Sequence, residues 1–109
     1  MLLLLLLAGC SKGPQADLQY ISKARSIAAE WALVNAQASE GKLTAHYVDT
    51  MREAAREQLQ TSQSALTQPQ SAYGREMEAL LAMPPDAPAG ALRAHAAKLK
   101  QIEDSLESD

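Results

Sequence analysis

Residues 17–66 read DLQYISKARSIAAEWALVNAQASEGKLTAHYVDTMREAAREQLQTSQSAL, and this stretch decides the fold. In its first half, apolar residues recur at steps of three and four, which is the spacing of one face of an α-helix. They are Leu18, Ile21, Ala24, Ala28, Trp31, Val34 and Ala38. Asp17 stands near the expected N-cap, and Gly41 suits the left-handed residue that follows a C-cap. The pattern predicts one long helix from Asp17 to Glu40.

The second half repeats the pattern after a short connection around Gly41. Thr44 is a favoured N-cap residue, and the helix face that follows it is apolar except at Ser62. The face consists of Val48, Met51, Ala55, Leu59, Ser62 and Leu66. Each long helix would extend about 35 Å at the usual rise per residue. Because the connection is short, we expect the two helices to fold back as an antiparallel hairpin.

The remainder of the chain predicts two shorter helices. Pro69 fits the first turn of a third helix that runs to about Met83 and stops at Pro84-Pro85. Asp86 is expected to cap a fourth helix that carries Pro88 in its first turn. The apolar face of this helix is Leu92, Ala96, Leu99, Ile102 and Leu106. Strand-like alternation is absent from the sequence, so the predicted class is all-α, an antiparallel hairpin of two long helices packed with two shorter helices.

The start of the chain has a different composition. Residues 2–7 are consecutive leucines, followed by Ala8-Gly9-Cys10 and then by the polar and helix-breaking run Ser11-Lys12-Gly13-Pro14. A membrane-spanning helix needs about 20 apolar residues, so the leucine run is too short to span. Its length matches the apolar core of a secretory signal, with small residues where a peptidase cuts. Cys10 is the one cysteine, which leaves no intrachain disulfide.

Leu7-Ala8-Gly9-Cys10, placed directly after a leucine run, resembles the lipobox of bacterial lipoproteins. The resemblance implies that the Cys10 thiol receives diacylglycerol through a thioether. It also implies that signal peptidase II cleaves before Cys10 and that a fatty acid such as palmitate joins the freed amine. The family pattern usually opens with Lys or Arg, whereas only Met1 precedes the leucines here. Two or three acyl chains on one cysteine would hold the protein to a membrane essentially permanently.

This interpretation divides the chain into three parts. Residues 1–9 are a signal peptide, residues 10–16 are the lipid anchor with a short linker, and residues 17–107 are the helical domain. By the same resemblance, Ser11 after the cysteine favours the outer over the inner membrane, with the domain in the periplasm. The linker would reach roughly 20 Å when fully extended, so the domain would stay close to the bilayer.

The sequence argues against most catalytic chemistries. The formal net charge is −3 with scattered Lys and Arg, which gives no basic patch for nucleic acid. His46 and Asp49 lie three apart and could offer two metal ligands, but a site usually needs three or four. His95 has no carboxylate within a turn of it in the sequence. With no strained-turn serine motif and no phosphate loop, we expect no enzyme, no metal and no cofactor.

Three groups of larger side chains are assigned to packing. Trp31 lies on the apolar stripe and is expected in the core, although an exposed anchor for a partner or for the lipid surface is the alternative. Met51, Met77 and Met83 are expected as core fillers. The tyrosines Tyr20, Tyr47 and Tyr73 are expected around the bundle ends with their hydroxyls in water.

These observations together predict a lipid-anchored, non-catalytic helical module of the bacterial cell envelope. Its role would be structural, or it would bind another envelope protein near the membrane. Two alternatives remain open. One is a small-ligand carrier with a pocket between its helices. The other is a self-associating helical protein, since small domains with thin cores often oligomerise.

Overall fold

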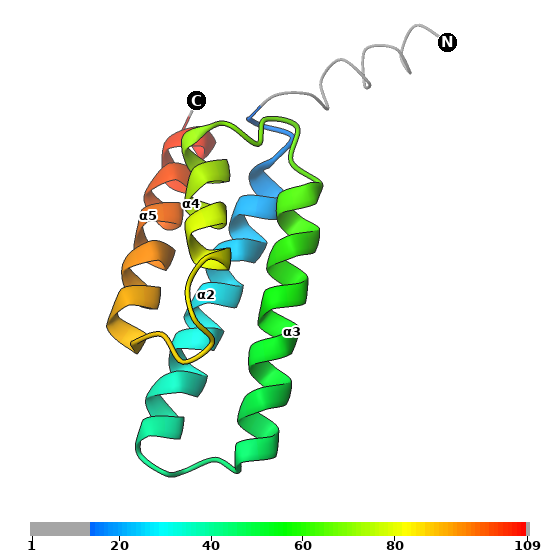
Figure 1. The fold of residues 1–109 in the computed structure, drawn as a ribbon. Helices are drawn as coiled ribbons and strands as arrows, with labels where there is room; N and C mark the ends of the chain where they lie inside the picture. Colours follow the sequence, from blue (N-terminus) through cyan, green and yellow to red (C-terminus); the bar gives the residue numbers. More distant parts are fainter. Residues whose placement is uncertain (1–13, 109) are drawn as a thin grey trace, which may run out of the picture.

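The computed structural model describes residues 14–108, which form four helices and no strand. The helices are α2 (Leu18–Ser39), α3 (Ala45–Ser64), α4 (Ala72–Leu81) and α5 (Ala89–Glu107). Figure 1 shows them side by side in one bundle, with the lower ends of α2 and α3 extending beyond α4 and α5. The predicted all-α class is confirmed. The predicted signal peptide and Cys10 lie outside the described residues.

The α2–α3 hairpin has the local features that the sequence predicts. Gly41 adopts φ +71°, the left-handed conformation that residues with a Cβ rarely adopt. At the start of α3, the Thr44 side chain accepts a hydrogen bond from the backbone N–H of Tyr47 at 3.2 Å. This is an N-cap, and the predicted cap at Thr44 is confirmed. The short connection therefore returns the chain alongside α2, as Figure 1 shows.

The predicted starts of the third and fourth helices, α4 and α5, were wrong. α4 begins at Ala72 and not at Pro69. Ser71 is its N-cap residue, because the Ser71 hydroxyl accepts a hydrogen bond from the N–H of Gly74 at 3.3 Å. α5 begins at Ala89 with Pro88 in the N-cap position and no side-chain cap, so Asp86 does not cap it. The carbonyl oxygens of Pro85 and Ala87, on either side of Asp86, accept hydrogen bonds from side chains of α2.

The core lies around α2, which makes its most extensive contacts with α5 and then with α3. α5 has 19 residues against 20 in α3, so only α4, with 10 residues, is markedly shorter. Trp31 is 5% exposed, which confirms its predicted place in the core. Met77 is fully buried and Met83 packs at the edge of the core, whereas Met51 is only half-buried. The largest side chains with no exposed surface include Ile21, Leu59, Met77, Leu80, Leu92 and Leu99.

An ion pair joins the two helices with the most extensive contact. The guanidinium Nε of Arg25 on α2 lies 2.7 Å from Oε1 of Glu103 on α5. The Glu103 residue is 6% exposed, so its carboxylate depends on this partner for the hydrogen bonds that water would otherwise give. The pair therefore fixes the register of α5 against α2 near the end of the bundle where the described chain starts.

Asp17 has a different role from the one that the sequence predicts. It occupies the N-cap position of α2, but its side chain makes no capping hydrogen bond. The carboxylate is fully buried and reaches the α3–α4 connection. There it accepts from the N–H and Oγ1 of Thr67, at 2.8 and 3.0 Å, and from the N–H of Gln68 at 3.2 Å. Asp17 thus joins the start of the bundle to a loop 50 residues away.

Tyr73 completes this cluster from α4. Its hydroxyl donates to Oδ2 of Asp17 at 2.6 Å, and the residue is 3% exposed, so the expectation that this hydroxyl lies in water was wrong. Burial, reinforced by the hydrogen bond to Asp17, raises the pKa of Tyr73 to about 12. The other two tyrosines differ, since Tyr47 is exposed and Tyr20 packs at the edge of the core.

The Tyr73 environment makes stability fall at high pH. Because the folded-state pKa is about 12 and the ordinary value is 10.0, the unfolded chain loses this proton first. The contribution of Tyr73 to stability is complete below pH 10.0 and is lost as the pH rises toward about 12. Urea unfolding between pH 9 and pH 12 should therefore show a falling free energy of unfolding. In Tyr73→Phe this fall should be shallower, and an equally steep fall in the variant would contradict the assignment.

Candidate functional site

Two side chains of α2 hold the connection between α4 and α5. The indole Nε1 of Trp31 donates to the carbonyl oxygen of Pro85 at 2.9 Å. One turn further along, the amide Nδ2 of Asn35 donates to the carbonyl oxygens of Pro85 and Ala87 at 3.1 and 2.8 Å. Residues four apart share one face of a helix, so both side chains reach the same segment. The backbone of this connection is thereby fixed over the C-terminal half of α2.

Asn35 also brings α3 to this point. Its side-chain oxygen Oδ1 accepts a hydrogen bond from Nε of Arg52 at 2.8 Å. Asn35 is 7% exposed, and its amide nitrogen and oxygen both have partners, as buried amides require. One asparagine therefore connects α2, α3 and the α4–α5 connection. It also fixes the position of the Arg52 guanidinium beside the Pro85 backbone.

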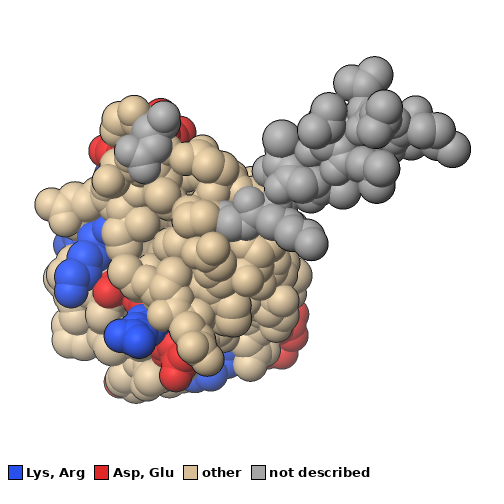
Figure 2. Space-filling view, turned by 90° about the horizontal axis from the view of Figure 1, so that it is seen from above, with Lys and Arg blue, Asp and Glu red and all other residues tan. Residues whose placement is uncertain are grey.

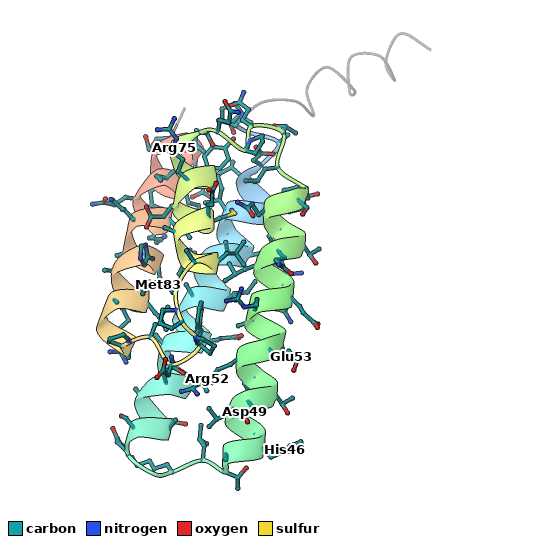
Figure 3. The ribbon with its side chains drawn as sticks, in the orientation of Figure 1. His46, Asp49, Arg52, Glu53, Arg75 and Met83 are labelled. Carbon is teal, nitrogen blue, oxygen red and sulfur yellow. The ribbon has the colours of Figure 1, made fainter. Side chains whose placement is uncertain are left out.

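A groove of about 280 Å³ opens beside this junction. Its lining surface is almost entirely apolar: Trp31 and Pro85 form one side, and four charged residues of α3 form the other, mainly with their carbon atoms. Figure 3 shows three of them, Asp49, Arg52 and Glu53, along the lower half of α3. We name the four the α3 charged stripe: Asp49, Arg52, Glu53 and Arg56. Two acids and two bases alternate along it, so the groove has no field of one sign that would attract a simple anion or cation.

The space between α2 and α3 on the other side of Trp31 is much smaller. It is lined by residues such as Val34, Met51 and Ala55 and has a volume of about 40 Å³. Pockets for drug-sized ligands have volumes of about 300–1,000 Å³. The groove at Trp31 is therefore the larger of the two spaces that adjoin this residue, and it lies at the surface.

The structure separates the two histidines. His46 is exposed on α3, and Asp49 is exposed one turn away. His95 on α5 is half-buried, and its Nδ1 pairs with Oε2 of Glu76 on α4. Lys98 Nζ lies 3.9 Å from Oε1 of the same carboxylate. Within residues 14–108, no three His, Cys, Asp or Glu side chains are grouped as potential metal ligands.

Sequence reasoning missed both Asn35 and the pairing of His95. Asn35 could have been found, because it is a polar residue one turn after Trp31 on a stripe that is otherwise apolar. The partner of His95 could not, since Glu76 lies 19 positions earlier and only the packing of α4 against α5 joins them.

Two findings bear on the membrane. The predicted lipidation site, Cys10, lies outside the described residues. None of the helices that the structure describes has the length and apolar character needed to cross a bilayer.

Comparisons with known proteins give no family for this chain. No family model matches it, and neither a curated protein nor a solved structure does. Function has to be inferred from the residues and from their arrangement.

Proposed function

We propose that the protein is a lipid-anchored, non-catalytic helical module of the bacterial cell envelope that binds another protein near the membrane surface. The observation that carries the proposal is the sequence of residues 2–10, a leucine run that ends in Leu7-Ala8-Gly9-Cys10. Cys10 would be the lipidation site and the first residue of the mature protein. Ser11 supports the outer over the inner membrane, with the helical domain in the periplasm.

The position of the domain along the chain supports a close tether. From Cys10 to Pro14, where the described residues begin, the chain can extend by at most about 14 Å. Figure 2 views the bundle from the end where the described chain starts. Most of the described surface in this view is tan, which marks residues other than Lys, Arg, Asp and Glu. An anionic bilayer would meet no concentrated acidic surface on that visible face. The bundle could therefore approach the membrane as closely as a short tether requires.

The groove at Trp31 supports a binding role. Its apolar side is fixed by the hydrogen bonds of Trp31 and Asn35, and its charged side combines acids with bases. A mixed pattern of this kind suits a protein partner with complementary charges better than a small ion. The alternative of a ligand carrier finds little room between α2 and α3 beside Trp31, where the space has only about 40 Å³.

Fatty-acid labelling tests the anchor. Cells that produce the full chain would be grown with an alkyne-bearing palmitate analogue, and label on the protein would be detected after a click reaction. We expect label on the wild type and none on Cys10→Ala, because the thioether needs the thiol. Ser11→Ala is the matched control and should keep the label. An unlabelled wild type, or equal label on Cys10→Ala, would refute the proposal.

A further inference from the structure

The α3 charged stripe has no ion-pair partner within the part of the bundle that the structure describes. Arg52 bonds to the neutral Asn35 amide, and no ion pair among residues 14–108 involves Asp49, Glu53 or Arg56. Asp49, Glu53 and Arg56 are exposed. The stripe also places like charges four residues apart, Asp49 with Glu53 and Arg52 with Arg56. Such pairs destabilise an isolated helix by a few tenths of a kcal/mol each, and the opposite charges three residues apart, Asp49 with Arg52 and Glu53 with Arg56, offset this.

The order of the charges is self-complementary. Along α3 the signs run minus, plus, minus, plus at positions 49, 52, 53 and 56. Positions 49 and 56 are equally far from the midpoint of the stripe, and so are 52 and 53. If a second α3 lies antiparallel across this midpoint, Asp49 faces Arg56 of the other copy and Arg52 faces its Glu53. Every charge then meets its opposite.

We propose that a second copy of this chain binds the α3 charged stripe through an antiparallel, two-fold symmetric contact between the two α3 helices. A two-fold contact uses the same patch on both copies, so the patch must be complementary to itself, and the stripe meets that condition. The four charge pairs relieve the like-charge spacing of the single helix. The groove of about 280 Å³ adjoins the stripe, so the second copy also covers apolar surface of Pro85 and Trp31.

The pairing also predicts how the dimer is oriented on a membrane. This prediction rests on the proposed lipid anchor, whereas the pairing itself does not. In an antiparallel pair, the two chain starts lie toward opposite ends of the dimer. Two copies anchored in one membrane therefore have their two-fold axis along the membrane normal. In the dimer the helices then lie along the bilayer surface, whereas a single copy would face the membrane with the end of the bundle where the described chain starts.

Charge reversal tests the pairing in the full-length chain. Two copies with different C-terminal tags would be produced in one cell, extracted from membranes with mild detergent and co-purified. Wild-type copies should co-purify. When both copies carry Asp49→Arg, or both carry Arg56→Asp, like charges face each other twice and recovery should fall about tenfold. Glu78→Arg and Arg93→Asp, the same reversals at exposed positions on α4 and α5, are the matched controls and should keep wild-type recovery.

The deciding sample combines the two variants. A copy with Asp49→Arg places its new positive charge opposite the new negative charge of a copy with Arg56→Asp. The reciprocal pair is unchanged, so this mixed pair should recover close to the wild-type yield. Recovery also shows that both variants fold. The proposal is overturned if wild-type copies do not co-purify, if the single reversals have no effect, or if the mixed pair stays as low as each variant with itself. Fatty-acid labelling of the same samples reports the anchor separately.

Discussion

Asp17→Ala should lower the free energy of unfolding by about 3 kcal/mol, because it removes one carboxylate that serves several donors. The Tyr73 hydroxyl would lose its acceptor in a buried place, and the N–H groups of Thr67 and Gln68 would lose theirs. Small domains have a total stability of about 5–15 kcal/mol, so the loss is a large fraction of it. Urea unfolding followed by circular dichroism at neutral pH would measure the change.

A second carboxylate provides the control for this substitution. Asp86 is exposed and does not cap α5, so Asp86→Ala should change stability by no more than about 0.5 kcal/mol. Equal urea midpoints for Asp17→Ala and Asp86→Ala would show that the buried cluster contributes nothing to stability.

Gly74→Ala should lower the free energy of unfolding as much as Asp17→Ala does, for a steric reason. A Cβ at Gly74 would lie 2.1 Å from the carbonyl oxygen of Pro69 and 2.6 Å from its carbonyl carbon. Both are backbone atoms, so the chain itself must move, and α4 must shift away from the loop that Asp17 holds. We expect a loss of about 3 kcal/mol, near the upper end for overpacked sites. The midpoint of urea unfolding would again report it.

Gly90→Ala is the matched control on α5. A Cβ there meets nothing within 4 Å, so the alanine should raise stability by about 0.5–1 kcal/mol through its higher helix propensity. If both alanine variants are stabilised alike, the close approach of Pro69 to Gly74 is not present in solution.

Local chemistry made the α2–α3 hairpin predictable from the sequence. The three- and four-residue spacing identifies the buried face of α2, Thr44 caps α3 with its own hydroxyl, and Gly41 provides the left-handed turn. Each of these depends on neighbours within a few positions. The sequence therefore contains everything needed to predict them.

Contacts between distant segments could not be predicted in the same way. Asp17 has the sequence position of a helix cap, but burial against Thr67 and Tyr73 gives its carboxylate stronger partners than the first turn of α2. Asp86 precedes a helix, yet the hydrogen bonds of Asn35 to Pro85 and Ala87 hold that segment out of helical conformation. In both cases tertiary contacts overrode a correct local preference.

Single residues of the candidate site could be predicted from the sequence, but the contacts between them could not. Trp31 was expected in the core, and it is buried there, but its role in fixing the Pro85 backbone depends on a partner 54 positions away. The charged residues of α3 can be read directly from the sequence. Their position beside a groove follows from the packing of the α4–α5 connection, which no periodicity in the sequence describes.

The most direct test of the central claim, attachment through Cys10, is mass spectrometry of the N-terminal peptide of the protein purified from bacterial membranes. We predict a peptide that begins at Cys10 and carries diacylglycerol on sulfur, with or without a further acyl chain on the amine. A peptide that still contains residues 1–9, or one with an unmodified Cys10 thiol, would contradict the account.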